Sequence, residues 1–262
     1  MTAEYTFDNA WVQARERLAL MESAFDPGSI RHLEQLGVRD GWHCLEVGAG
    51  GGSIASWLCR KVGPSGHVIA TDLDTRFLER LDFPNLAVHR HDVASEPLPE
   101  SAFDLVHCRL LLMHLPERER ALHAMVNALK PGGWLLVEEA GEASAPPDSG
   151  FEGAALFNRG TSAFIEIQAR AGVDWTYGRR LYGDIRAAGL HDLDGEGRVS
   201  VVAAGTLSAR GQQLSLAQQR DRIVGAGLLT EEEMDRFLAL FDDPGLVTIG
   251  ITLMAVWGRK PL

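Results

Sequence analysis

The stretch from Glu46 to Ser53 brings together an acidic side chain, three alternating glycines and a hydroxyl, in the order Glu-Val-Gly-Ala-Gly-Gly-Gly-Ser. An apolar run over about 43–48 predicts a strand. Helical periodicity then predicts a helix that begins at Ser53, a residue type favoured as an N-cap. Glycine suits a sharp turn that lies against a ligand, because a Cβ would obstruct both the turn of the backbone and the approach of the ligand. The N-terminus of the following helix offers N–H groups to an anionic or polar group. The stretch therefore indicates a site for a nucleotide-like ligand.

Side chains that can bind polar groups recur where later strands are predicted to end. Asp72 closes the run Val-Ile-Ala-Thr-Asp, Asp92 follows a third short strand, and Arg109 follows a fourth strand over 103–108. Open α/β sheets bind ligands beyond the carboxyl ends of their strands, so we expect these side chains to gather around the glycine turn. The alternatives are a solvated turn acid for Asp72, a helix or turn cap for Asp92 and a surface ion pair for Arg109.

Two residues further along the chain are candidates for proton transfer. His114 lies in Leu-Met-His-Leu-Pro after the fourth strand, and its imidazole can take a proton near neutral pH. Glu139 ends the fifth predicted strand. The alternative for His114 is packing against the sheet. Glu139 can instead bind a substrate hydroxyl or amine, or cap a helix. Both are therefore candidate catalytic residues.

The elements that position these side chains alternate between strand and helix from about residue 40 to 140. This pattern predicts a parallel sheet with helices on its faces. Further helices are predicted at 9–25, 27–36, 151–172 and 179–188. Strands six and seven are predicted at 199–203 and 248–257, with a capping box formed by Thr230 and Glu233 between them.

These elements predict one domain over 1–262. Residues 1–40 form an N-terminal helical cap and 41–140 a cofactor-binding core. Residues 141–262 form the rest of the sheet, with a helical insertion at about 207–246. We expect the N-terminal cap and the insertion to cover a substrate pocket. The alternative is that both only pad the sheet.

Composition excludes several classes of protein. The 262 residues are 45% hydrophobic, enough for a large core, and the net charge of −11 comes without a basic run, so we expect no nucleic-acid partner. Cys44, Cys59 and Cys108 lack metal-type spacing, and His89 and His91 lack an apparent third ligand, so we expect no metal. With no leader pattern and no membrane-length apolar run, we expect a cytoplasmic protein that binds no membrane.

The order of these motifs resembles the class I S-adenosylmethionine-dependent methyltransferases. Their first motif is similar to acidic-x-Gly-x-Gly-x-Gly, whereas a dinucleotide fingerprint would require glycine where Ser53 stands. The later motifs of the family follow in the expected order. They are the acidic positions Asp72 and Asp92, the strand Phe-Asp-Leu-Val-His-Cys, and the turn and strand Lys-Pro-Gly-Gly-Trp-Leu-Leu-Val. The resemblance covers about 40–140 closely and the remainder loosely. It implies a Rossmann-like seven-stranded, mostly parallel sheet with an antiparallel strand seven, plus N-terminal and C-terminal helical cap segments.

The resemblance also implies a cofactor, S-adenosyl-L-methionine, and residues that bind its amino-acid end. The backbone of Gly48, Ala49 and Gly50 is expected against that end. Glu46 contacts the ammonium group or braces the loop, and Arg109 lies where the family contacts the methionine part through backbone.

Other residues are implied for the nucleoside end. Asp72, with Leu73 beside it, is expected to accept both ribose hydroxyls, and Asp92 the adenine amino group. The Val93 N–H is expected to meet a ring nitrogen.

The implied reaction is metal-free in-line transfer of a methyl group to an O, N or C atom of a small molecule, in secondary metabolism. The motifs that mark nucleic-acid, protein-arginine and magnesium-dependent catechol enzymes of the family are absent after strand four, where Cys-Arg-Leu-Leu stands. We expect a monomer or homodimer. Two alternatives remain: a NAD-dependent oxidoreductase, and a non-catalytic cofactor-binding partner protein.

Overall fold

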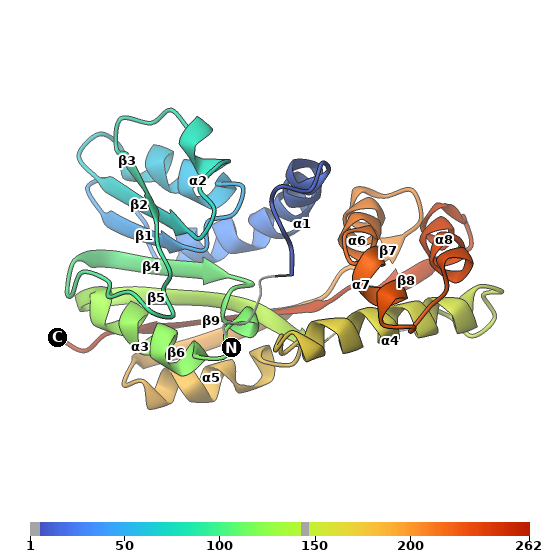
Figure 1. The fold of residues 1–262 in the computed structure, drawn as a ribbon. Helices are drawn as coiled ribbons and strands as arrows, with labels where there is room; N and C mark the ends of the chain where they lie inside the picture. The colour runs from blue at the N-terminus through green and yellow to red at the C-terminus, as the bar shows by residue number, and fades with distance from the viewer. Residues whose placement is uncertain (1–5, 143–146) are drawn as a thin grey trace.

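The sheet at the centre of the fold is mostly parallel (Figure 1). Its strands are β1 His43–Val47, β2 His67–Asp72, β3 Leu86–Arg90, β4 Phe103–Arg109, β5 Leu129–Glu142, β6 His191–Arg198 and β9 Thr252–Arg259. The computed structural model describes residues 6–142 and 147–262, and within them these seven strands pair in the order β3-β2-β1-β4-β5-β9-β6. Strands β1 to β5 run parallel, whereas β9 is antiparallel to β5 and β6. The predicted fold class is therefore confirmed.

Helices cover both faces of this sheet. They are α1 Ala14–Gln35, α2 Ser53–Val62, α3 Arg118–Ala128 and α5 Gly178–Ala187, with the short 3-10 turns η1 Leu78–Arg80 and η2 Leu112–His114. Successive residues of a strand point to opposite faces, so neighbouring residues of β4 join different cores. Leu105 packs with Leu58 of α2, and Val106 packs with Leu122 of α3. Among the described residues, no helix has both the length and the apolar character that crossing a bilayer requires.

A second group of elements lies beside the sheet and is called here the helical part (Figure 1). It consists of α4 Ala154–Arg170, β7 Val201–Ala203, α6 Leu207–Ala217, α7 Arg220–Gly225, α8 Glu231–Ala239, η3 Leu240–Asp242 and β8 Val247–Ile249. Its core contains Phe157, Phe237 and Phe241, whose ring centroids lie 5.8–5.9 Å apart. The Phe237 ring lies over Gly160, where a Cβ would come within 2.5 Å of it. The predicted capping box of Thr230 and Glu233 is confirmed at the start of α8.

The N-terminal segment differs from the prediction of two helices at 9–25 and 27–36. One helix, α1, runs from Ala14 to Gln35 with Pro27 inside it, and Trp11 lies before its start. A proline removes one helical hydrogen bond. Here the side chains of Asp26 and Ser29 contact β4 and β5 on either side of Pro27, which fixes the helix against the sheet.

The start of α2 also differs from prediction. Gly52, at φ 86°, is the N-cap, and Ser53 is the first helical residue. The Ser53 hydroxyl donates to the Asp26 carboxylate at 3.1 Å instead of capping its own helix. The residue expected to cap α2 therefore ties it to α1.

The prediction of strand six at 199–203 is wrong. The sixth strand of the main sheet is β6, His191–Arg198, whereas β7 pairs with β8 in a separate small sheet. β6 was missed because His-Asp-Leu-Asp-Gly-Glu-Gly-Arg has almost no apolar residues. As an edge strand it is largely exposed, so burial does not demand them. The segment predicted as strand seven, 248–257, is divided between β8 and β9.

Candidate functional site

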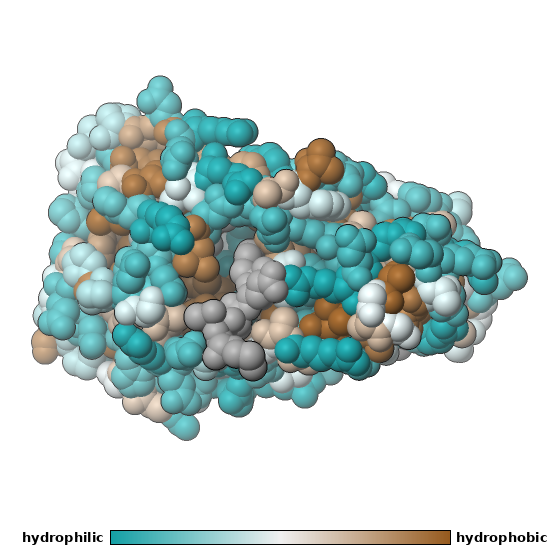
Figure 2. Space-filling view, viewed as in Figure 1, coloured by the Kyte–Doolittle hydropathy of each residue, from teal (hydrophilic) through white to brown (hydrophobic). Residues whose placement is uncertain are grey.

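A pocket of about 1060 Å³ lies between the sheet and the helical part. The carboxyl ends of β1, β2 and β4 form one wall, and residues of α1, α4 and α6 form the others. Figure 2 shows a largely hydrophilic surface with a hollow between the two parts. The volume lies just above the usual range for small-molecule sites, roughly 300–1,000 Å³. The pocket therefore has room for a cofactor and a second molecule.

The glycine turn lies in the wall of this pocket. Gly48 and Gly50 have φ of 69° and 54°, a region that favours glycine. A Cβ on Gly48 would lie 3.0 Å from the Leu111 side chain, so the turn and the loop after β4 fit closely. Gly48 and Gly50 line the pocket, whereas Ala49 packs away from it against the core beneath α2.

Asp72 lies at the end of β2, next to the turn. Its carboxylate accepts from the N–H of Gly50 at 2.9 Å and from the N–H of Asp74 at 3.0 Å. Burial raises the pKa of Asp72, and these two N–H groups oppose the rise. A carboxylate oxygen accepts more than one hydrogen bond, so both oxygens can also accept from a diol in the pocket. Leu73 lines the pocket beside it and is half exposed.

Asp92 and Val93 lie after β3 and also line the pocket. The Asp92 carboxylate accepts from the Ala94 N–H at 3.0 Å and from the Ser95 hydroxyl at 2.7 Å, so it caps the turn that it begins. Val93 is buried beside it.

The groups along the sheet edge stand in a fixed order. Following the strands β3, β2, β1 and β4, the pocket meets Asp92, Asp72, Gly48 and then Arg109. The order expected for adenine, ribose and amino acid is the same, and these three groups are joined in that sequence in S-adenosylmethionine. The order of these residues therefore suits this cofactor.

Behind the turn, the sheet face toward α1 becomes polar. The apolar residues on this face are Cys44, Leu105 and Leu136. Two positions further along the same strands, and on the same face, are Glu46, His107 and Glu138. His107 Nδ1 lies 2.6 Å from Glu46 and Nε2 lies 3.2 Å from Glu138. Burial opposes a charge on His107, but the two carboxylates outweigh it and raise its pKa to about 9. Glu46 is thus engaged by His107 and does not line the pocket.

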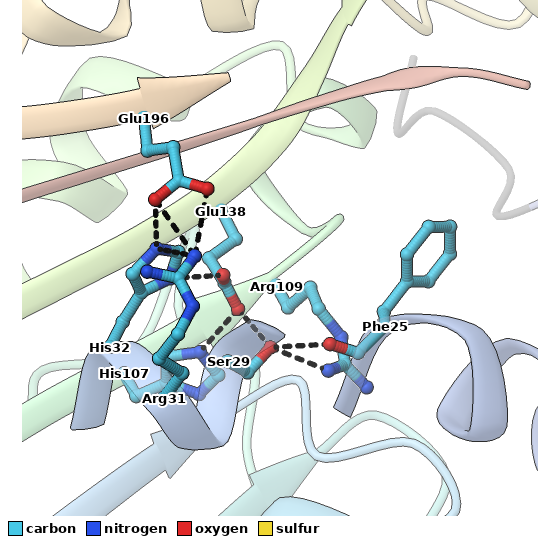
Figure 3. Close-up of polar contacts among 8 residues, drawn as sticks. All are labelled: Phe25, Ser29, Arg31, His32, His107, Arg109, Glu138 and Glu196. Carbon is cyan, nitrogen blue, oxygen red and sulfur yellow. Dashed lines mark hydrogen bonds and ion pairs between the residues drawn. The ribbon is translucent and has the colours of Figure 1, made fainter. Parts of the chain in front are cut away.

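Helix α1 joins this buried network (Figure 3). The Ser29 hydroxyl donates to Glu138, and His32 Nδ1 lies 3.2 Å from the other Glu138 oxygen. The Arg109 guanidinium donates to Ser29 at 2.8 Å and to Asp26 at 2.8 Å. Burial works against ionisation of Glu138, but bonds from His107 and His32 hold its pKa below the usual range. His32 Nε2 also lies 3.4 Å from Glu196 of β6, so the network connects α1, four strands and the pocket.

The loop after β4 is held by Glu139. Its carboxylate accepts from the backbone N–H groups of Leu111 at 3.0 Å, Leu112 at 2.6 Å and Met113 at 3.2 Å. Burial raises the pKa of Glu139 to about 7, against the effect of these three donors. Leu110 has φ 52°, a strained backbone for a residue other than glycine, and lines the pocket. Glu139 does not line the pocket and anchors the loop that does.

His114 ends this loop and lines the pocket. Burial lowers its pKa to about 4, and the positive charges of Arg17 and Arg118 add to the effect. The ring meets Phe7 edge-on at 6.2 Å. At neutral pH the imidazole is therefore uncharged.

On the side of the helical part, the pocket is lined by both aromatic and polar side chains; the polar ones include Ser208, Gln212 and Ser215 of α6. Trp11, Phe157, Phe164 and Trp175 line the pocket, whereas Tyr177 and Phe237 are buried and do not; Phe237 lies behind the wall, against Phe157. Phe241 lines it as well. Within the described residues, no three His, Cys, Asp or Glu side chains gather in a way that could hold a metal ion, and the three cysteines are free and buried.

Sequence reasoning missed the residues that α1 supplies. Asp26, Ser29 and His32 repeat at a spacing of three, which places them near one face of a helix. A polar stripe on a helix that packs against a sheet is a signal for buried polar partners. Those partners, Glu46, His107 and Glu138, alternate with apolar residues along their strands, which is the matching signal.

Known proteins similar to this chain are methyltransferases. A family model described as a methyltransferase domain matches residues 45–137. The methyltransferase str2 of Strobilurus tenacellus is 36% identical over 140 residues, which are 52% of this chain and 49% of that protein. The ubiquinone/menaquinone biosynthesis C-methyltransferase UbiE of Pseudomonas entomophila is 33% identical over 115 residues, 41% of this chain and 45% of that protein. Each match thus spans about half of the relative's length.

Solved structures share the fold at low identity. Phosphoethanolamine N-methyltransferase 2 of Haemonchus contortus, in complex with phosphomonomethylethanolamine and S-adenosylhomocysteine, has a TM-score of 0.60 and 16% identity, covering 96% of this chain and 58% of that chain. A methyltransferase from Bacillus halodurans, whose own activity is unassigned, has a TM-score of 0.56 and 20% identity, covering 90% of this chain and 100% of that chain. The glycine turn, the order of the pocket residues, the sheet topology and these similarities agree. Residues 45–137 therefore match the methyltransferase domain family, and the fold is the one seen in structures of S-adenosylmethionine-dependent methyltransferases.

Proposed function

We propose that this chain transfers a methyl group from S-adenosylmethionine to an O, N or C atom of a small, largely apolar molecule. The observation that carries the proposal is the continuity of the pocket. It begins at the ordered polar groups of the sheet edge and ends among the aromatic side chains of the helical part. One end suits the cofactor and the other an apolar acceptor.

The residues divide the work along the pocket. Asp72 would accept from the ribose hydroxyls, Asp92 from the adenine amino group, and the Gly48–Gly50 backbone would meet the amino-acid end. The cofactor, when bound, supplies an activated methyl group on a sulfonium sulfur. Walls from the loop after β4 and from α1 would then hold the acceptor in line with that methyl group and exclude water. Glu139 contributes by anchoring Leu111 and its neighbours, not by touching the reactants.

We propose His114 as the group that takes a proton from an acceptor, because it lines the pocket. Its pKa of about 4 keeps the imidazole in the uncharged form that accepts a proton at neutral pH, and it also makes His114 a weak base. We expect His114→Ala to lower the rate about 100-fold at neutral pH if the acceptor arrives protonated. His123→Ala, on the exposed side of α3, is the control. A near-normal rate for His114→Ala would leave His114 as a wall residue.

The wider setting is also proposed. The relatives named methyltransferase str2 and UbiE are compatible with a role in small-molecule metabolism, and we place the reaction in secondary metabolism. We further propose a cytoplasmic monomer or homodimer that needs no divalent metal. Loss of transfer on adding a chelator, with recovery on adding magnesium, would contradict the last point.

Calorimetry tests the cofactor first. We expect binding of S-adenosylmethionine and S-adenosylhomocysteine and no binding of NAD. The reverse result would favour an oxidoreductase. Transfer of labelled methyl groups into pools of apolar small molecules then tests catalysis. Cofactor binding without transfer into any pool would favour a non-catalytic partner protein.

A further inference from the structure

Helix α1 lies directly against the glycine turn. A Cβ on Gly50 would lie 3.6 Å from the Leu18 side chain, and a Cβ on Gly51 would collide with the Glu22 carboxylate. Leu18 and Glu22 both belong to α1. The position of this helix and the shape of the turn are therefore not independent.

The Asp26 carboxylate joins α1 to two parts of the cofactor site. It accepts from the Ser53 hydroxyl at 3.1 Å, at the start of α2 just after the turn, and from Arg109 at 2.8 Å, at the end of β4. The side chains of Asp26 and Arg109 are 20% and 12% exposed, so the ion pair is shielded from solvent far more than a surface pair. Asp26 itself does not line the pocket, whereas Arg109 does.

Arg109 is oriented by two hydrogen bonds that it donates to residues of α1. One terminal nitrogen donates to Ser29, and the guanidinium lies 5.9 Å from the Phe25 ring centroid (Figure 3). The other terminal nitrogen donates to Asp26. A guanidinium has five N–H donors, so donors remain for a carboxylate in the pocket. Val47 and Cys108 are register partners on β1 and β4, which places Arg109 beside Gly48. This is the place expected for the amino-acid end of the cofactor.

We infer that Asp26, with Ser29, is a positioning residue that holds Arg109 toward the carboxylate of the cofactor's amino-acid end, so that α1 docking and cofactor binding stabilise each other. The inference rests on the proposed function, because it requires this cofactor. The contact concerned is the one between Asp26 of α1 and Arg109 of β4. Because Asp26 lies outside the pocket wall, its substitution should weaken the interaction with the amino-acid end of the cofactor only.

The test compares two ligands that differ in that end. S-adenosylhomocysteine carries the amino-acid chain, and methylthioadenosine lacks it. Calorimetry is carried out on the full chain and on Asp26→Ala. We expect Asp26→Ala to lower the affinity for S-adenosylhomocysteine about tenfold and the affinity for methylthioadenosine less than about twofold. The reason is that one charge-assisted contact is disturbed at the amino-acid end.

Two further variants separate positioning from a general structural role. Asp26→Glu keeps a carboxylate that can still reach Arg109 and should recover most of the lost affinity. Asp40→Ala is the matched control, because Asp40 also accepts from a serine hydroxyl, that of Ser65, but lies before the start of β1. It should leave both affinities unchanged.

Hydrogen exchange gives a readout that needs no activity. S-adenosylhomocysteine should slow exchange in residues 14–35 of the wild-type chain, and this protection should be reduced in Asp26→Ala. An equal loss of affinity for both ligands in Asp26→Ala, or an unchanged affinity for S-adenosylhomocysteine, would overturn the inference. Wild-type chain that binds neither ligand would overturn the proposed function, and the inference with it.

Discussion

The sheet edge at the cofactor site and the core of the helical part are both buried, but they are held in opposite ways. At the sheet edge, His107 bridges Glu46 and Glu138, and Ser29 and Arg109 extend the contacts to α1. These groups need fixed partners and angles, because an unpaired buried charge is costly.

The core of the helical part is made instead by Phe157, Phe237 and Phe241, with no polar bond among them. Apolar contacts tolerate exchange of shape if volume is kept. The difference indicates that the sheet edge is built to keep one geometry, whereas the core of the helical part tolerates exchange of its side chains.

Removing the charged centre of the network should produce the largest effect. In His107→Gln the carboxylates of Glu46 and Glu138 lose their shared cation, and the free energy of unfolding should fall by about 3–5 kcal/mol. Chemical denaturation measures the change. His123→Gln, on an exposed histidine, should have almost none. If the two variants unfold alike, the network does not stabilise the fold.

The same contrast has a pH signature. The pKa of His107 is raised to about 9 in the folded chain, against about 6.5 in an unfolded chain. Its contribution is therefore fully present below pH 6.5 and is lost as pH rises through 9. The stability gap between wild type and His107→Gln should shrink by on the order of 2–3 kcal/mol across that window. A gap that stays constant from pH 6 to pH 10 would show that His107 is neutral in the fold.

Asp72→Ala tests the cofactor end directly. Loss of the hydrogen bonds that the proposed function gives Asp72 with the ribose should weaken the binding free energy of S-adenosylhomocysteine by about 2–3 kcal/mol. The affinity should then fall roughly 30- to 150-fold. Asp104→Ala is a suitable control, because Asp104 also accepts from a backbone N–H, that of His43, at the opposite end of the sheet. Unchanged affinity in Asp72→Ala would remove it from the ribose site.

Phe237→Leu should give the smallest effect and complete the comparison. The cavity left beside Gly160 should cost about 1–2 kcal/mol of stability, and cofactor affinity should remain at the wild-type value. Denaturation and calorimetry on the same sample measure both. A clear loss of cofactor affinity would show that the two regions are coupled more tightly than their contacts suggest.

Patterns in the sequence were sufficient for the parallel sheet and for where most pocket residues lie. Glycine spacing and acidic strand ends are local signals, and they located Gly48, Asp72 and Asp92 correctly in the pocket wall. They did not reveal that Glu46 faces His107, because that contact depends on the register between β1 and β4. β6 was missed for a related reason: an exposed edge strand has no apolar pattern to recognise.

The role of Glu139 shows a further limit. A carboxylate at a strand end suits catalysis, substrate binding and loop anchoring equally well in sequence. Only the three N–H groups that point at it distinguish them. A single helix through Pro27 was similarly unforeseen, because its position against the sheet depends on contacts with Arg109, 80 or more positions away.

The pairing of β7 with β8 has a consequence for how this chain can diversify. Ala203 and Val247 are register partners, so the chain leaves for α6 and returns after η3 at neighbouring points. A segment with adjacent ends can be lengthened, shortened or replaced at little entropic cost to the rest of the chain. Recombination or grafting between 204 and 246 would then change one wall of the pocket, the wall that the proposed function assigns to the acceptor, and leave the sheet edge intact.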